Sequence, residues 1–211
     1  MDLLAEMAEK LLDGDDQSVS ELTREAIARG LPPRQILDSG LIGGMARVGE
    51  QFKTHQIFLP EVLMAAKAMN AGMDVLKPLL LQEGIPMLGK VVLGSVQGDL
   101  HDIGKNLVGI MLNGAGLEVI DLGNDVAPEQ FVDAAVQRDA VVIGMSALLT
   151  TTMPAMKTVV DLLNEQGLTG KVKTIIGGAP VSLQFAREIG ADARGYDAGN
   201  AVERVKELVG R

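Results

Sequence analysis

The pattern of apolar residues changes near residue 87, and this change constrains the fold more than any other feature of the chain. Beyond it, helix-length segments alternate with short runs rich in Val, Ile and Leu: Val91–Val96, Leu117–Leu122, Ala140–Ser146, Val172–Ile176 and a weaker Ala191–Tyr196. Near-continuous apolar strands joined through helices are typical of a parallel sheet that is covered on both faces. We therefore predict an α/β domain over residues 87–211, with a Rossmann-like (flavodoxin-like), doubly wound, five-stranded parallel sheet.

Residues 1–86 instead carry apolar residues three to four positions apart, which is the spacing of helices with one buried face. Four such stripes begin at Leu4, Val19, Leu37 and Leu59. We predict that they form a four-helix bundle, a cap domain separate from the α/β domain. The segment Gln82–Pro86, which contains Gly and Pro, is the predicted linker between the two domains.

The composition excludes several classes of function. The net charge of −9 argues against nucleic acid or an anionic membrane as a partner, since both attract clustered Lys and Arg. Without cysteine the chain has no disulfide, thiolate nucleophile or Cys-based zinc site. The first residues are acidic rather than basic, and no apolar run approaches transmembrane length, so we expect a cytoplasmic protein.

One of only two histidines, His101, lies in the segment Gly98–Asn106 that leaves the first predicted strand. Open α/β sheets bind their ligands at this end of parallel strands. Asp99, two residues before His101, can hold one imidazole nitrogen and direct the other toward a metal. Two simpler roles are a solvated loop histidine and an Asp99 that only caps the helix expected to begin near Asp102.

Two further motifs stand at the ends of predicted strands. Ser146-Ala147-Leu148 follows the third strand and Gly177-Gly178 the fourth, whereas Asp99-x-His101-x-x-Gly104 follows the first. With all three in this order, the chain resembles the cobalamin (corrinoid)-binding family over its full length. It is most similar to the methyl-carrier corrinoid proteins of methylamine, methanol and aryl methyl ether methyltransferase systems. The cobalamin module of methionine synthase shares the helical cap.

The resemblance implies a metal site and a relay of protons behind it. His101 is expected to be the lower axial ligand of cobalt, in place of the benzimidazole of the cofactor. Asp99 is expected to accept a hydrogen bond from the other ring nitrogen of His101, and the hydroxyl of Thr152 to close the relay. These three residues, His101, Asp99 and Thr152, are the predicted chemical centre.

The same resemblance implies how the corrinoid is held. Ser146 is expected to bond the displaced benzimidazole, Gly177 and Gly178 to let the nucleotide tail lie against the backbone, and Gly104 to do the same beneath the corrin ring. The remaining residues expected to contact the corrinoid neighbour these motifs: Gly98, Asp102, Ile103, Leu148, Thr150, Ala179 and Tyr196.

As a function, the resemblance implies a carrier subunit that turns over nothing alone. It would carry a methyl group on cobalt from a substrate-specific methyltransferase to a second methyltransferase acting on tetrahydrofolate or coenzyme M, with a reductive activator as a further partner. An adenosylcobalamin mutase small subunit is an alternative, but it is expected to lack the helical domain.

Two more candidate functions belong to different classes of protein. A cobalamin-dependent regulatory or sensor protein needs a DNA-binding module, and no basic recognition helix is visible in the sequence. A flavodoxin-like nucleotide binder would hold phosphate in the Gly94–Gly104 loop. The absorption spectrum of the purified protein distinguishes a flavin from a corrinoid.

Overall fold

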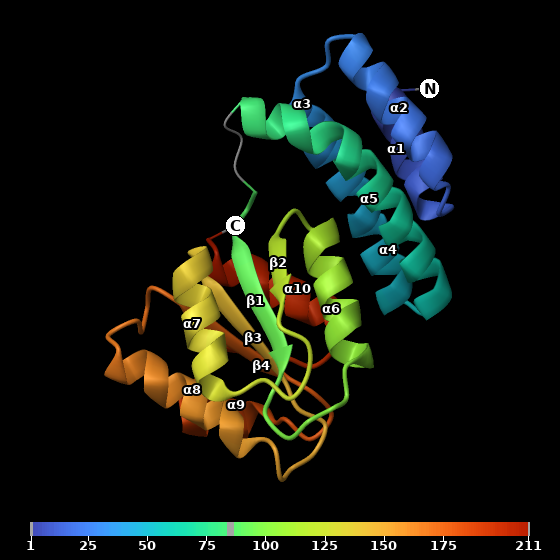
Figure 1. Ribbon diagram of the computed structural model, residues 1–211. Helices are drawn as coiled ribbons and strands as arrows, with labels where there is room; N and C mark the ends of the chain where they lie inside the picture. The colour runs from blue at the N-terminus through green and yellow to red at the C-terminus, as the bar shows by residue number, and fades with distance from the viewer. Residues whose placement is uncertain (1, 84–86, 211) are drawn as a thin grey trace. The chain divides into compact units, whose positions relative to one another are not determined.

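The computed structural model describes residues 2–83 and 87–210. The chain divides into two compact units, which we call the helical unit (Met1–Met87 with Asn113–Gly116) and the sheet unit (Leu88–Leu112 with Leu117–Arg211). Both are drawn in Figure 1. The linker predicted at Gln82–Pro86 lies largely outside the described residues.

The helical unit contains the predicted amphipathic helices. In chain order they are α1 (Leu3–Leu12), α2 (Asp16–Ala28), α3 (Pro33–Gln35), the π-helical segment η1 (Ile36–Ile42), α4 (Gly43–Lys53) and α5 (Leu59–Gln82). The carboxylates of Asp2 and Asp15 accept backbone N–H groups at the starts of α1 and α2. The buried faces of the helices carry the apolar stripes that the sequence predicts, with Leu11, Val19 and Leu76 fully buried.

The third predicted helix is not a regular α-helix. Residues 33–53 are helical throughout, but the middle of this stretch, η1, has the wider π-helical turn. A Cβ atom at Gly40 would lie 2.6 Å from Sδ of Met7, and one at Gly44 would lie 3.2 Å from Cα of Ala8, so both glycines lie against α1. Apolar residues four positions apart fit either helix type over one or two turns, and the spacing therefore did not reveal the π-helical turn.

The sheet unit confirms the predicted doubly wound architecture. Its parallel strands are β1 (Lys90–Ser95), β2 (Glu118–Asp121), β3 (Val142–Ser146), β4 (Lys173–Gly177) and β5 (Ala193–Gly195), in the spatial order β2-β1-β3-β4-β5. The connecting and final helices are α6 (Ile103–Gly114), α7 (Pro128–Arg138), α8 (Pro154–Glu165), α9 (Leu183–Ile189) and α10 (Ala198–Leu208).

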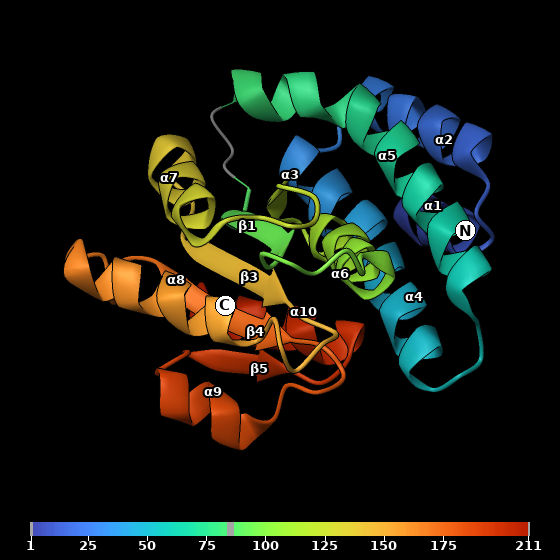
Figure 2. The same cartoon turned by 60° about the horizontal axis from the view of Figure 1, so that its bottom comes forward.

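Each face of the sheet has its own apolar core, because successive strand residues point to opposite faces. On one face Ile143 of β3 packs with Phe131 of α7 and Met156 of α8. On the other face Val142 of β3 packs with residues of α6 and α10, Val205 among them. Figure 2 shows α7, α8 and α9 on one side of the sheet and α6 and α10 on the other.

The strand register brings small residues into one row at the carboxyl ends of the strands. Ser95 of β1 pairs with Ser146 of β3, Ser146 with Gly177 of β4, and Gly177 with Gly195 of β5. The chain winds away from β1 in both directions, so β1 and β3 flank the switch point at which open α/β sheets form ligand crevices. The motifs that follow β1, β3 and β4 therefore meet at one edge.

We expect Gly94→Ala to destabilise the protein by about 1–3 kcal/mol, because the new methyl group would overpack the core. Its Cβ would lie 2.8 Å from two atoms of the buried Phe131 ring. Gly43→Ala is the matched control, since its Cβ would meet only Asp38 O at 3.5 Å, and helix propensity favours alanine. Urea unfolding of both variants tests this: equal stabilities would contradict the packing argument.

Candidate functional site

The buried carboxylate of Asp99 is the centre of the site. Its side chain is fully buried, and its Oδ1 accepts hydrogen bonds from the backbone N–H of His101 at 3.1 Å and from Nδ1 of the His101 ring at 2.8 Å. An ionised carboxylate only accepts hydrogen bonds, so Nδ1 carries the proton and Nε2 of the neutral ring keeps its lone pair. The His101 side chain is 53% exposed. It therefore presents an oriented imidazole at the carboxyl end of β1.

The second oxygen of Asp99 binds the loop between β3 and α8. Oδ2 accepts hydrogen bonds from the backbone N–H groups of Leu148 at 2.7 Å and Leu149 at 3.2 Å, and from the hydroxyl of Thr152 at 2.8 Å. The Thr152 hydroxyl also lies 2.8 Å from the carbonyl oxygen of Leu149. One hydroxyl proton cannot serve both acceptors fully, and the charged oxygen of Asp99 is the stronger acceptor.

These hydrogen bonds determine the charge of Asp99. Burial by itself would raise the pKa of this carboxyl, but the bonds from the Leu148 backbone, the His101 ring and backbone, and the Thr152 hydroxyl outweigh burial and hold the pKa well below its usual range. Asp99 is therefore ionised at neutral pH. The simpler role of Asp99 as a helix cap is wrong, because α6 begins only at Ile103 and every described partner of the carboxylate lies outside it.

The backbone around His101 is held by residues that sequence reasoning missed. The buried hydroxyl of Ser95 donates to the carbonyl oxygen of His101 at 2.6 Å. Asp125, in the loop between β2 and α7, accepts a hydrogen bond from Gly98 N at 2.7 Å and donates its own N–H to Asp99 O at 3.0 Å. Nothing in the sequence links residue 125 to residue 98, since the sheet alone brings the two loops together.

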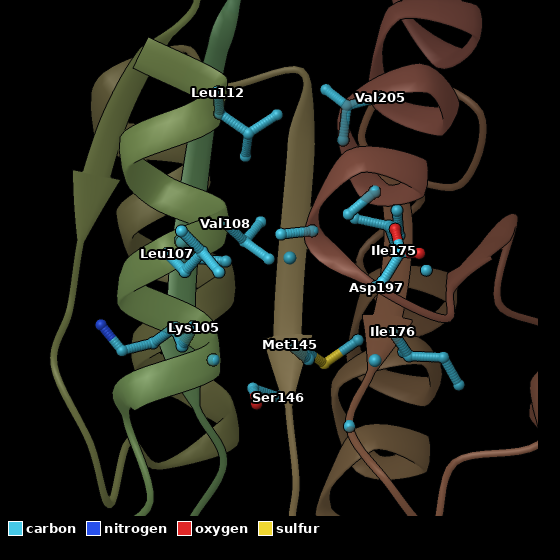
Figure 3. A pocket seen from close by; sticks show the side chains of 18 of the residues that line it. Lys105, Leu107, Val108, Leu112, Met145, Ser146, Ile175, Ile176, Asp197 and Val205 are labelled. Carbon is cyan, nitrogen blue, oxygen red and sulfur yellow. The ribbon is translucent and has the colours of Figure 1, made fainter. Parts of the chain in front are cut away.

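An apolar cavity of about 200 Å³ lies beside this network, between α6 and α10. Figure 3 shows Val108 and Leu112 on the α6 side, Val205 on the α10 side, and Ser146 near the carboxyl end of β3. Ser146 makes no side-chain hydrogen bond with the part of the chain that the structure describes, so its hydroxyl is available to a ligand. Ile175 of β4 adds to the apolar lining.

Lys105 is a third residue that sequence reasoning missed. Its side chain is almost completely buried at the cavity wall, yet Figure 3 shows it directed away from the cavity. Nζ donates to both carboxylate oxygens of Asp121 and to Oδ1 of Asn106, each at 2.6 Å. All three ammonium protons thus have acceptors. Lys105 joins the start of α6 to the end of β2.

The motif glycines occupy two different environments. Gly178 has φ +121°, and a Cβ atom there would lie 1.9 Å from the carbonyl oxygen of Ala147, so the fold itself requires glycine. A Cβ at Gly177 would lie 3.1 Å from the carbonyl oxygen of Gly195. At Gly104 a Cβ would meet nothing within 4 Å. The packing of the chain therefore gives no reason for glycine at position 104.

The predicted site residues belong to loops, strand ends or the first turn of α6 at this edge of the sheet. Those that line the cavity are Gly104, Ser146, Gly177, Gly178 and Tyr196. Those outside it belong to the loops after β1, β3 and β4 or, for Ile103, to the first turn of α6: Gly98, Asp99, His101, Asp102, Ile103, Leu148, Thr150, Thr152 and Ala179. Exposed apolar side chains stand next to His101, with Leu100 at 69% and Ile103 at 74% exposure.

The donor set fits a metal that arrives inside a larger cofactor. Residues 2–83 and 87–210 contain no group of three or more His, Cys, Asp or Glu side chains able to hold a metal ion. A single imidazole suffices where a macrocycle supplies the other ligands, and the exposed apolar rim and the cavity can take the remainder of such a cofactor. Over the same residues no helix is long and apolar enough to span a membrane.

Comparison with known proteins gives matches over nearly the whole chain. Residues 89–206 match the family described as B12 binding domain, and residues 3–77 match a second family of the same description. The chain is 42% identical to trimethylamine corrinoid protein 1 of Methanosarcina mazei over 97% of this chain and 96% of that protein. It is also 42% identical to a corrinoid protein of Desulfitobacterium hafniense over 100% of this chain and 99% of that one.

Two solved structures have the same fold. A chain of the methanol:cobalamin methyltransferase complex of Methanosarcina barkeri superposes with a TM-score of 0.87 at 32% identity, over 98% of this chain and 79% of that chain. A cobalamin-binding protein from Desulfitobacterium hafniense superposes with a TM-score of 0.81 at 33% identity, over the full length of both chains.

We expect Asp99→Asn to lower the free energy of unfolding by about 1–3 kcal/mol at neutral pH, because an amide cannot accept at both of its atoms and leaves a buried donor unpaired. The folded pKa of Asp99 lies below the unfolded value of about 3.9. Its stabilising effect is therefore complete above that value and is lost as the pH falls toward the folded pKa.

Urea unfolding of the apoprotein at pH 7 and at successively lower pH tests this expectation. The stability gap between wild type and Asp99→Asn should narrow in acid. Asp133→Asn, on the exposed side of α7, is the control for removing one carboxylate without this network. A gap that stays constant down to pH 3 would show that the charge of Asp99 contributes nothing.

Proposed function

The chain belongs to the family of corrinoid proteins with a B12-binding domain, and we propose that it carries a methyl group between two methyltransferases. The corrinoid, when bound, supplies a cobalt centre that accepts and releases the methyl group. The observation that best supports this role is the exposed His101 imidazole, whose Nδ1 is held by the buried Asp99 carboxylate at 2.8 Å. In this proposal the chain consists of a helical cap domain, residues 1–86, and a corrinoid-binding domain, residues 87–211.

His101 is the proposed lower ligand of cobalt, through Nε2. Asp99 fixes the ring orientation and makes Nε2 more basic by accepting the Nδ1 proton, as carboxylates do behind metal-bound histidines. Thr152 donates to the other oxygen of Asp99 and so extends this chain of hydrogen bonds toward the loop after β3. The proposed roles are ligation by His101 and control of its proton by Asp99 and Thr152.

The cavity between α6 and α10 is the proposed site of the nucleotide tail. Its apolar lining suits an aromatic base, and Ser146 offers a hydroxyl that has no hydrogen-bond partner among residues 2–83 and 87–210. Gly177 and Gly178 expose backbone at its wall, and Gly104 keeps the start of α6 open beside the corrin ring. The exposed side chains of Ile103 and Leu148 then lie at the edge where the ring is bound.

Two methyltransferases and a reductive activator are the proposed partners. The names of the relatives support methylamines as methyl donors, and the superposed methanol:cobalamin methyltransferase complex supports methanol. The second methyltransferase would act on tetrahydrofolate or coenzyme M. The match of residues 3–77 to a B12-binding family favours this function over a mutase small subunit, for which no helical domain is expected.

Substitution of His101 tests the ligand assignment. The Co(II) spectrum of the cobalamin-loaded protein with ¹⁵N-labelled histidine should show coupling to one histidine nitrogen, and His101→Ala should abolish it. His55→Asn is the control for the other histidine, because His55 has φ +59° and Asn tolerates this conformation. An unchanged spectrum in His101→Ala would show that His101 is not the cobalt ligand.

Gly104→Ala separates binding of the corrinoid from folding. Apart from its own helix and chain neighbours, the added methyl group meets no described atom within 4 Å, so apoprotein stability should stay within about 0.5 kcal/mol of wild type. If the ring packs over this position, cobalamin affinity should fall at least about tenfold through overpacking of the interface. Equal affinity for the two proteins, measured by titration of the apoprotein, would place the ring elsewhere.

A further inference from the structure

A pair of hydrogen bonds ties the segment before His101 to the loop between β2 and α7. Oδ1 of Asp125 accepts the N–H of Gly98 at 2.7 Å, and the N–H of Asp125 donates to the carbonyl oxygen of Asp99 at 3.0 Å. The two bonds run in opposite directions between the same short segments. They fix both the separation and the orientation of the two segments.

Both partners have backbone conformations that few residues adopt. Asp125 has φ +52° and Gly98 has φ +82°, so both lie in the left-handed region. For a residue other than glycine this conformation carries a strain that the surrounding contacts must offset, and such strain is concentrated at functional sites. In the part of the chain that the structure describes, the hydrogen bonds of Asp125 that can offset this strain are those to Gly98 and Asp99.

The same segments are joined a second time through Ser95 at the end of β1. The N–H of Ser95 donates to Gly123 O at 3.0 Å, and its hydroxyl donates to His101 O at 2.6 Å. Val126 N donates back to Ser95 O at 3.0 Å. In the segment Gly98–His101, Ser95 thus holds the later end, at His101, and Asp125 holds the earlier end, at Gly98.

At the earlier end, one hydrogen bond within the turn runs from Asp99 N to Val96 O at 2.9 Å, and Asp125 supplies the bonds that join the turn to the neighbouring loop. Gln97 and Gly98 are exposed, so few packing contacts restrain the turn. The side chain of Asp99 is anchored separately, through Oδ2 to Leu148, Leu149 and Thr152. Loss of the Asp125 bond would therefore leave the Asp99 carboxylate in place while the backbone between Gly98 and His101 shifts against it.

We propose that Asp125 is a positioning residue that presents the His101 imidazole to cobalt. It acts through the backbone of Gly98 and Asp99, to which its hydrogen bonds run, rather than through a bond to the imidazole. The inference rests on the proposed ligation by His101. It adds that the loop after β2 determines the fraction of protein molecules in which the imidazole is bound to cobalt. The site therefore draws on three loops, those after β1, β2 and β3.

Three substitutions at one position separate the hydrogen bond from the strain. Asp125→Asn keeps an acceptor oxygen and a side chain that tolerates the left-handed region. Asp125→Gly keeps the conformation but loses the bond, and Asp125→Ala loses the bond and adds strain. Val132→Ala, on the buried face of α7, is the control for a general loss of stability with Asp125 intact.

Full-length apoproteins are loaded with cobalamin, and the histidine nitrogen coupling in the Co(II) spectrum is measured together with cobalamin affinity. Wild type and Asp125→Asn should show full coupling. Asp125→Gly and Asp125→Ala should show a mixture with an uncoupled form and roughly five- to tenfold weaker binding, which corresponds to the net contribution of one typical hydrogen bond. Val132→Ala should be less stable yet fully coupled.

The outcomes distinguish this inference from the proposed function. Full coupling in Asp125→Gly and Asp125→Ala would overturn the positioning role while His101 ligation stands. Absence of coupling in the wild type would overturn both. Partial coupling in Val132→Ala equal to that in Asp125→Gly would show that any loss of stability produces the effect, and the positioning role would fall.

Discussion

One buried carboxylate, that of Asp99, connects the elements of the site. A charge removed from water is costly unless donors surround it, and Asp99 has five, from its own loop and from the loop after β3. The donors in the second loop come from residues about fifty positions later in the chain. Neither loop can move far without leaving a buried charge poorly solvated, so the orientation of His101 and the path of the β3–α8 loop are determined together.

The parallel register supplies the space next to this carboxylate. Because Ser95, Ser146, Gly177 and Gly195 fall in one row, the carboxyl end of the sheet carries small side chains from β1 to β5. The helices α6 and α10 both cover one face of this sheet, and their apolar side chains close the cavity further along the strands. A ligand that enters from the loops therefore meets polar groups first and an apolar interior behind them.

Sequence alone predicted the features that arise from local pattern. The central strands β1, β3 and β4 are buried on both faces, so their aliphatic runs marked them clearly, and the spacing of Asp99 and His101 already implied a held imidazole. Ser95, Lys105 and Asp125 were missed because their partners are tertiary: each joins segments that only the sheet brings together. The π-helical turn of η1 was missed because its apolar spacing also fits a regular helix.

The glycines show why a matching motif does not by itself assign a role to each of its members. The loops that follow β3 and β4 pass so close together at Gly178 that any side chain there would collide with the Ala147 carbonyl group. Gly104 satisfies no such need of the apoprotein. Both belong to the same signature, yet only Gly104 is left without a reason internal to the fold. The fold accounts for Gly178, whereas Gly104 finds a reason only in the proposed binding of the corrin ring against the start of α6.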